Sequence, residues 1–324
     1  MAIIRDLTKL DYGKINKNKF KIIVKNKYLY FMLLPVMLWY IIFNYIPMYG
    51  VVLAFKTYVS GSLKDFLIGG KWVGLEYFKE LFESDLFFRA LKNTMIISSY
   101  KILFLFPLTI VLALMLNEVR NVKFKKIVQT VAYLPYFFSW VIVGTIVIQL
   151  FTSQGGIISQ IYSFFNDGQA KNLLLDKNNF RTILVASNGI KGIGFGTIIY
   201  LAAIAGVSSE IYEACEIDGG NRFQKIWYIT LPSISNTMVI MLLLTISFMI
   251  SGDFEQVLML YTPTVYETGD ILDTYIYRLA LKQGDFSFAT AVGLFKSFVS
   301  LALLVSSNII SKRIFGQSIF GSED

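Results

Sequence analysis

The chain has 324 residues, of which 55% are hydrophobic and 16% are charged. Because soluble domains usually carry about 25% charged residues, this composition indicates a membrane-embedded protein. The formal net charge is +8. The chain has no His and a single Cys, Cys215, so a His/Cys metal site and an internal disulfide are both excluded.

The N-terminal segment, 1–28, is strongly basic, with eight Lys or Arg side chains in its first 27 positions. A basic excess can indicate nucleic-acid binding. Here it precedes an apolar segment, and basic flanks set the orientation of such segments in a membrane. We therefore predict a cytoplasmic segment and no nucleic-acid partner. The long apolar run and the lack of a small-residue cleavage site argue against a cleavable signal peptide.

Six apolar segments approach the roughly 20 residues that a spanning helix needs. They predict an all-α, polytopic membrane protein with six transmembrane helices at 29–310, followed by a cytoplasmic tail at 311–324. The segments lie at about Leu29–Ile46, Thr94–Leu116, Ile127–Phe151, Ile183–Val207, Ser233–Ser251 and Phe286–Ile310.

Before the second span, Gly74–Leu91 has apolar residues at helical spacing on one face, although Asp85 and Phe87 break the pattern. This predicts a helix on the outer membrane surface or an amphipathic helix packed on protein, and the pattern leaves both open. In the fourth span, Gly192 and Gly196 are four residues apart, which predicts close helix packing in lipid rather than a ligand site.

Basic residues near the span ends predict the orientation. The N-terminal segment and the short loop Asn117–Lys126 are the most basic connections. The connection at 47–93 has six basic residues, which argues the other way, but they are spread thinly among acids. We therefore expect both termini and the connection at 207–233 to be cytoplasmic, with Cys215 in a reducing compartment.

The connection at 207–233 carries most of the functional signal. It reads Y-E-A-C-E-I-D-G-G-N-R-F-Q-K-I-W-Y-I-T-L-P from Tyr212 to Pro232. Ser209 is expected to cap a helix that runs from Glu210 to Asp218. Gly219-Gly220 should end it, and a second helix should follow at Arg222–Tyr228. Leu231-Pro232 should stop this helix and open the next span.

Two short helices joined by a glycine elbow would form a contact surface for a soluble partner, although a plain amphipathic connector fits the same pattern. Glu213 and Glu216 lie on one helical face, but a surface loop offers them no pocket. We therefore predict no paired-carboxylate catalysis and no enzymatic activity. The chain also contains no P-loop, so a nucleotide would have to be bound by another subunit.

The spacing of E-A-C-x-x-D-G (213–219) and I-T-L-P (229–232) resembles the EAA loop of binding-protein-dependent ABC importer permeases. Y-L-P-Y-F-F-S-W (133–140) and A-T-A-V-G-L-F-K-S (289–297) are similar to the carbohydrate branch, the LplB-like permeases. The resemblance runs from about Tyr28 to Arg313. This chain departs from the family's usual residues at three places. Cys215 replaces the second alanine of the loop, Gly219-Gly220 replaces Gly-Ala, and Phe254-Glu255-Gln256 replaces Phe-Asp-Gln.

The resemblance implies the type I ABC importer permease fold and an oligosaccharide substrate. It also implies a second homologous permease, two cytoplasmic ATPase subunits and an extracytoplasmic solute-binding lipoprotein as partners. The chain itself would hold no cofactor, since ATP and Mg would be bound by the ATPase. The loop 208–232 would couple to the ATPase through Glu213, Ala214, Cys215, Asp218, Gly219, Leu231 and Pro232.

Sugar sites combine aromatic faces with polar groups. The candidates for the substrate path are Tyr136, Ser139, Trp140, Asn188, Lys191 and Gln256, of which Gln256 is weaker than the others, and Tyr100 is a further weak candidate. The alternative is that aromatic residues in membrane helices pack on neighbours or lie at the interface.

Three lysines lie within predicted spans, at Lys101, Lys191 and Lys296. An ionisable group there is a functional candidate by default, here as a cationic patch for an acidic sugar. We favour the alternatives, which are snorkelling to the outer headgroups or pairing with Asp253 or Glu255.

Two other functions remain open. A permease of the same architecture could carry a peptide, an amino acid or phosphate. A self-contained secondary carrier would be expected to show inverted repeats and acidic residues within its spans, and neither is evident in the sequence.

Overall fold

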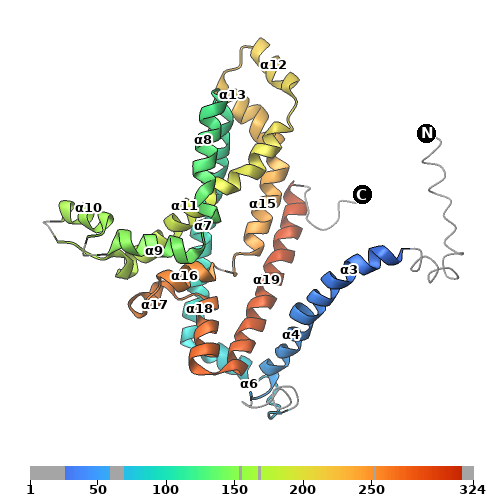
Figure 1. The fold of residues 1–324 in the computed structure, drawn as a ribbon, viewed down its shortest axis with the longest axis vertical. Coiled ribbons are helices and arrows are strands. Elements are labelled where there is room, and N and C mark those ends of the chain that lie inside the picture. The colour runs from blue at the N-terminus through green and yellow to red at the C-terminus, as the bar shows by residue number, and fades with distance from the viewer. Residues whose placement is uncertain (1–25, 59–68, 153–154, 167–168, 252, 316–324) are drawn as a thin grey trace, which may run out of the picture. The chain divides into compact units, whose positions relative to one another are not determined.

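The computed structural model describes residues 26–58, 69–152, 155–166, 169–251 and 253–315. Most of the predicted N-terminal segment, and the tail from residue 316 on, therefore lie outside the described residues. The chain divides into two compact units, Met1–Val52 and Leu53–Asp324, and each is described by itself (Figure 1). The described residues form helices, one isolated bridge between Lys56 and Trp72, and no strand.

The described part of the first unit is helical and contains the first predicted span. It runs through α3 (Lys27–Tyr40), a π-helical turn η2 (Ile41–Tyr45) and α4 (Ile46–Met48), and then passes into the 3-10 segment η3 (Tyr49–Phe55). The whole stretch is long and apolar enough to cross a membrane. Its α3 side chains are exposed, as expected for a helix whose apolar surface faces lipid.

Three long helices form the frame of the second unit, and each contains a predicted span: α7 (Asp85–Glu118), α11 (Lys177–Ala205) and α19 (Phe286–Phe315). The Ser84 hydroxyl caps α7 by accepting from the Phe87 N–H, and the Asp176 carboxylate caps α11 by accepting from the Asn178 N–H. With 34 residues, α7 rises about 50 Å, more than the hydrocarbon core of a bilayer.

The predicted third span, Ile127–Phe151, is wrong as a single straight helix. The chain forms α8 (Val122–Tyr133), a 3-10 turn η4 (Leu134–Phe137) and α9 (Trp140–Phe151), with a bend of 100°. Pro135 disfavours continuation of α8 because it lacks an N–H and restricts the residue before it. Ser139 then caps α9 by accepting from the Ile142 N–H at 3.4 Å.

The fifth span is also a bent pair. The segment Arg222–Ser233 meets α15 (Ser235–Ser247) at 62°. If each bent pair is counted as one span, the described residues contain six spans, the number that the sequence predicts.

The segment before α7 packs on protein. It forms α6 (Glu76–Glu83), and Leu81 is fully buried in a core cluster with Phe87 and Leu272. Of the two hypotheses for Gly74–Leu91, packing on protein is therefore the one that the structure shows. The break at Ser84 also explains the imperfect pattern, because Asp85 and Phe87 belong to the next helix.

The connection between α15 and α19 folds back as a hairpin of short helices, anchored by a buried ion pair. Both Asp270 carboxylate oxygens accept from the Arg278 guanidinium, at 2.6 and 3.1 Å, and Asp270 has no exposed surface. Asn93 of α7 donates to the Asp270 carbonyl, and Arg181 of α11 donates to Asn93. The hairpin consists of α16 (Phe254–Leu260), η7 (Pro263–Val265), α17 (Tyr266–Gly269), α18 (Leu272–Tyr277) and η8 (Arg278–Lys282).

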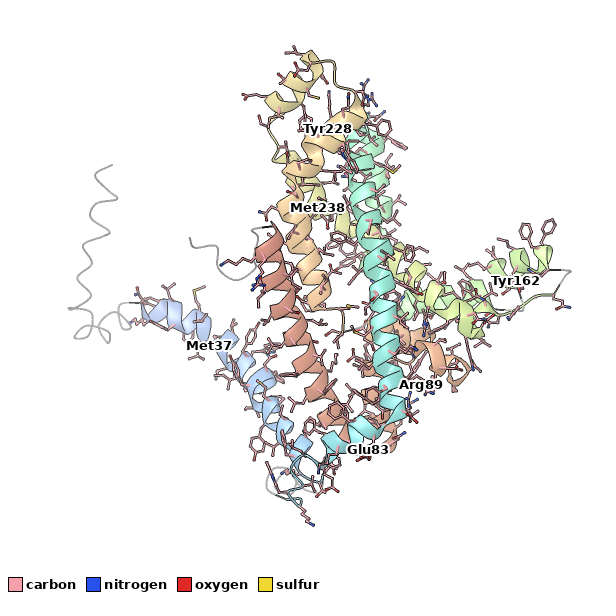
Figure 2. The ribbon with its side chains drawn as sticks, turned by 180° about the vertical axis from the view of Figure 1, so that it is seen from behind. Met37, Glu83, Arg89, Tyr162, Tyr228 and Met238 are labelled. Carbon is pink, nitrogen blue, oxygen red and sulfur yellow. The ribbon has the colours of Figure 1, made fainter. Side chains whose placement is uncertain are left out.

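Two smaller helical elements connect α9 to α11, namely α10 (Ile157–Phe165) and the 3-10 turn η5 (Leu173–Leu175). The second unit thus has two distinct ends (Figure 1). The connection that carries α12 and α13 lies at one end, and α6 and α18 lie at the other. Figure 2 shows the same separation, with Tyr228 at the first end and Glu83 and Arg89 at the second.

Candidate functional site

The connection between α11 and α15 begins with α12 (Ser209–Ile217). The capping residue is Ser208, whose hydroxyl accepts from the Glu210 N–H at 3.3 Å, and the prediction of Ser209 is wrong by one residue. Ser208 has the extended backbone of a capping residue, and Ser209 is already helical. Glu210 lies in the first turn, where a negative charge is favoured by the helix dipole.

A glycine elbow follows α12. Gly219 has a φ of +80°, a conformation that a side chain makes costly. Gly220 then donates its N–H to the Cys215 carbonyl at 2.8 Å. A Cβ at position 220 would lie 2.3 Å from the Cys215 sulfur, so Cys215 occupies the space that a side chain at 220 would need. The two departures from the family pattern, Cys215 and Gly220, are therefore in direct contact.

The second helix, α13 (Arg222–Lys225), starts with a capping box. The Asn221 side chain accepts from the Gln224 N–H, and the Gln224 side chain accepts from the Asn221 N–H. Lys225 forms an ion pair with Glu216 that ties α13 to α12. The hydrogen bond from Lys225, together with its charge, holds the pKa of the Glu216 carboxyl below its usual value.

The prediction that Leu231-Pro232 stops the second helix is wrong. The helix continues through a π-helical turn, η6 (Ile226–Thr230), into α14 (Leu231–Ser233), and the bend falls after Ser233. In the π turn the Leu231 N–H donates to the Ile226 carbonyl five residues earlier. This wider turn is the kind of local adjustment that accommodates a proline without ending a helix.

The surface of this connection is exposed and partly apolar. Glu213, Ala214, Asp218 and Gly219 are exposed around the elbow, while Cys215 is half-buried. Leu231 instead packs against a buried cluster that includes Tyr200, and Pro232 is exposed. Four large apolar side chains that were not predicted as functional are more than two-thirds exposed here: Ile217, Phe223, Trp227 and Tyr228. Their apolar character within a charged loop was the available signal.

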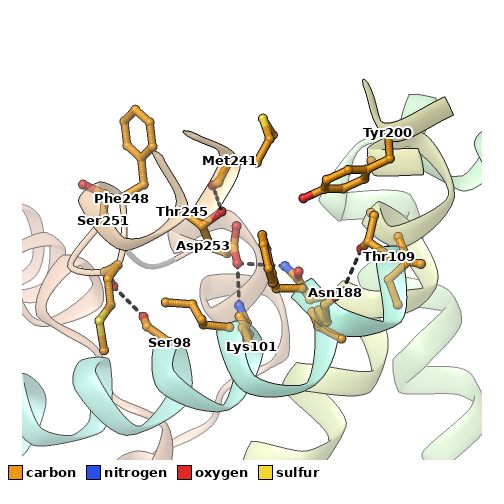
Figure 3. Close-up of a pocket in the computed structure, with 17 residues that line it drawn as sticks. Ser98, Lys101, Thr109, Asn188, Tyr200, Met241, Thr245, Phe248, Ser251 and Asp253 are labelled. Carbon is orange, nitrogen blue, oxygen red and sulfur yellow. Dashed lines mark hydrogen bonds and ion pairs between the residues drawn. The ribbon is translucent and has the colours of Figure 1, made fainter. Parts of the chain in front are cut away.

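The second candidate site is a cavity of about 360 Å³ between α7, α11 and α15 (Figure 3). One side is polar. The Lys101 ammonium donates to an Asp253 carboxylate oxygen at 2.5 Å, and the Asn188 amide donates to the same oxygen at 2.7 Å. The other walls are mainly apolar and include Phe106, Ile193, Met241 and Phe248. Tyr200 projects into the space from α11 (Figure 3).

Gln256 supports the polar side from behind, where it is fully buried. Its carbonyl oxygen accepts from the Lys101 ammonium at 2.7 Å, and its NH2 group donates to the Leu184 carbonyl and the Ser187 hydroxyl. Gln256 therefore positions Lys101 and does not line the cavity. Of the six substrate-path candidates, Asn188 is the one that lines it.

The other four candidates gather at the break between α8 and α9. The Lys191 ammonium donates to the carbonyls of Tyr136 and Phe138, both at 2.7 Å, and lies over the Tyr136 and Trp140 rings. Tyr136 stacks on Phe195 of α11, with ring centroids 3.9 Å apart. Lys191 thus satisfies carbonyls where the helical ladder is interrupted, which a membrane requires. Ser139 serves as the α9 cap.

The three in-span lysines have different partners. Lys101 pairs with Asp253, one of the two partners considered from the sequence. Lys296 pairs with Asp273 of α18, and Lys191 binds carbonyls. The cavity residues that the sequence analysis missed include Ser98, Thr109, Thr245 and Tyr200. Polar residues within apolar spans were a signal for the first three, whereas nothing distinguished Tyr200 from an ordinary packing residue.

Comparison with known proteins agrees with this architecture. Residues 106–316 match the family described as "Binding-protein-dependent transport system inner membrane component". The chain belongs to this family of multi-pass bacterial inner-membrane proteins, and its fold is that of a type I ABC importer permease.

Two relatives from Bacillus subtilis (strain 168) are similar over most of their length. The polygalacturonan/rhamnogalacturonan transport system permease protein YteP is 42% identical over 92% of each chain. Protein LplB is 41% identical over 91% of this chain and 92% of its own, so the resemblance to LplB-like permeases is confirmed. A crystal structure of a bacterial alginate ABC transporter in complex with alginate pentasaccharide-bound periplasmic protein matches with a TM-score of 0.84. That match has 38% identity and covers 94% of this chain and all of that one.

Proposed function

We propose that this chain is a permease subunit of an ABC importer for oligosaccharides or glycan fragments. It would form half of the translocation pathway, beside a second homologous permease, and would receive sugar from an extracytoplasmic solute-binding lipoprotein. The relatives support the substrate class, because one carries polygalacturonan or rhamnogalacturonan in its name and the solved transporter is bound to an alginate-loaded periplasmic protein.

The observation that carries the proposal is the exposed elbow between α12 and α13. Charged residues surround it, and Ile217 is 87% and Phe223 84% exposed. Large apolar side chains held out by two capped short helices form a compact projection that a cleft on an ATPase surface would bury. The ATPase would bind ATP and Mg, and this chain would contain neither a cofactor nor a catalytic site.

A cluster of packed side chains connects the segment after the elbow to the cavity. Leu231, which follows α13 and η6, packs on the cluster that contains Ile110 of α7 and Tyr200 of α11, with Met241 of α15 beside it. Tyr200 and Met241 also line the cavity. Closure of the ATPases on nucleotide binding would therefore move the elbow, displace this shared cluster and switch the pathway from inward-facing to outward-facing.

The proposed function also predicts the orientation of the chain in the membrane. The elbow would lie in the cytoplasm, together with both termini, 1–28 and 311–324. The end that carries α6 and α18 would face the outside and the binding protein. The permease domain would then occupy 29–310, with the coupling loop at 208–232.

The cavity chemistry suits a sugar. A pyranose ring presents hydroxyl groups and apolar C–H faces, and the cavity offers a polar side at Asn188 and Asp253 opposite apolar walls with Phe106 and Phe248. Because Lys101 and Asp253 neutralise each other, this side provides hydrogen bonds without a strong net charge. Its volume of about 360 Å³ lies within the usual range of small-molecule sites.

The test is reconstitution in liposomes with the companion permease, the ATPase and the binding protein. We expect ATP-dependent accumulation of labelled galacturonan or alginate oligosaccharides, and none without the ATPase. Accumulation of peptides, amino acids or phosphate in place of sugars would support the alternative substrates. Concentrative transport by this chain alone, without nucleotide, would refute the coupling mechanism.

A further inference from the structure

Four glycines of α11 lie between positions 189 and 196, and three of them lie in close contact with neighbouring helices, Gly194 with backbone and the other two with side chains. An added Cβ would lie 2.9 Å from the Leu105 side chain at Gly189, 2.0 Å from the Ala132 carbonyl oxygen at Gly194, and 2.9 Å from the Thr109 side chain at Gly196. These glycines let α7 and α8 approach α11. The sequence-based prediction of packing therefore holds for Gly196.

Gly192 is different, because an added Cβ there would meet no atom of the described residues within 4 Å. The prediction that it serves close helix packing is wrong. A helix-interior glycine destabilises a helix by about 1 kcal/mol relative to alanine, so its presence calls for another reason. Gly192 lines the cavity, one turn after Asn188 and one turn before Gly196. The half-buried backbone at Gly192 thus lines the cavity beside Asn188 of its polar side.

We propose that Gly192 is a size-determining residue of the sugar path, where the missing side chain leaves room for a sugar ring beside Asn188 and Asp253. This inference rests on the proposed transport function. The size of the cavity supports it. A leucine side chain would place four carbon groups, each about as large as a water molecule, in a cavity of about 360 Å³.

The first experiment compares Gly192→Ala and Gly192→Leu with wild type in the reconstituted complex, using a labelled galacturonan or alginate oligosaccharide that the wild type accumulates. We expect Ala to reduce uptake less than threefold and Leu to reduce it at least tenfold. ATP hydrolysis stimulated by the binding protein should remain in both. Gly293→Leu is the matched control, because Gly293 also lies within a spanning helix, has no atom within 4 Å of an added Cβ, and does not line the cavity. It should transport at the wild-type rate.

The second experiment adds the bulk after folding. Gly192→Cys should assemble with its small side chain, and treatment with the charged reagent sulfonatoethyl methanethiosulfonate should then abolish uptake. Dithiothreitol should restore it, and the loss of uptake should exceed that of wild type treated in the same way, whose native thiol is Cys215 in the coupling elbow. Mass spectrometry measures the labelling. Uptake that persists after full labelling, or a failure to label position 192, would overturn the inference.

The two proposals fail in different ways. A wild-type complex that accumulates no oligosaccharide would refute the transport function itself. A wild-type complex that transports normally, together with an equally active Gly192→Leu variant, would refute the size-determining role of Gly192 alone.

Discussion

Replacing Lys191 by Met should lower the thermal stability of the permease without changing its preference among glycans. The Lys191 ammonium donates to the carbonyls of Tyr136 and Phe138 at the break between α8 and α9. A buried acceptor left without a donor costs about 1–3 kcal/mol. Both residues are about 40% exposed, so the lower limit applies to each carbonyl. The expected loss is therefore ~2 kcal/mol in total.

The assay heats the detergent-solubilised complex to a series of temperatures and measures by size-exclusion chromatography how much of it stays folded, which gives the Tm. A loss of this size corresponds to a shift in Tm of about 4 °C or more. Lys191→Gln, which keeps one NH2 donor group, should recover part of the shift. Lys92→Met is the matched control, because Lys92 is exposed on α7, and its Tm should stay within about 1 °C of wild type.

The result that would refute this reasoning is an unchanged Tm together with a selective loss of acidic-glycan uptake. That combination would return Lys191 to the substrate path, as the cationic group that the sequence alone left open.

Three further predictions concern the elbow and the hairpin. Gly219→Pro should uncouple ATP hydrolysis from uptake while membrane insertion stays intact, because position 219 has a φ of +80° that proline cannot adopt; normal uptake would count against the coupling role. Gly220→Ala should weaken ATPase binding in a pull-down assay, and adding Cys215→Ala should restore part of it, because the larger part of the clash is with the Cys215 sulfur. Asp270→Asn should destabilise the protein by about 3 kcal/mol, because it leaves the Arg278 guanidinium half-paired in a buried site. The double variant Asp270→Leu with Arg278→Met should have a Tm closer to that of wild type than Asp270→Asn has.

The sequence predicts the spans well where a helix is long and uninterrupted. α7, α11 and α19 follow directly from apolar length, because a continuous helix satisfies its own backbone in a membrane. The break at Leu134–Ser139 was not predicted. Pro135 is compatible with either a kink or a full change of direction, and the choice depends on Lys191 and Phe195 of α11, which lie about 55 residues further along the chain.

In the coupling loop, too, only the features that depend on local sequence could be predicted. Gly219 was predicted as the turning point, because a positive φ is a local property that glycine reports directly. The continuation of the second helix through Pro232 was not predicted, since the π turn at Ile226–Thr230 depends on packing. The cavity was beyond sequence reasoning for a related reason: Tyr200 lines it together with residues of α7 and α15, which are far from it in the sequence.

The contact between Cys215 and Gly220 also limits the order in which this loop can change during evolution. A lineage that starts from Cys215 and Gly220 can reach alanine at both positions more easily by losing the sulfur first, because this removes the shorter of the two contacts below 3 Å. The opposite order passes through a protein in which a methyl group and a sulfur atom compete for one space, 2.3 Å apart. The two positions should therefore be inherited together, and a change at one should be a marker for the residue at the other.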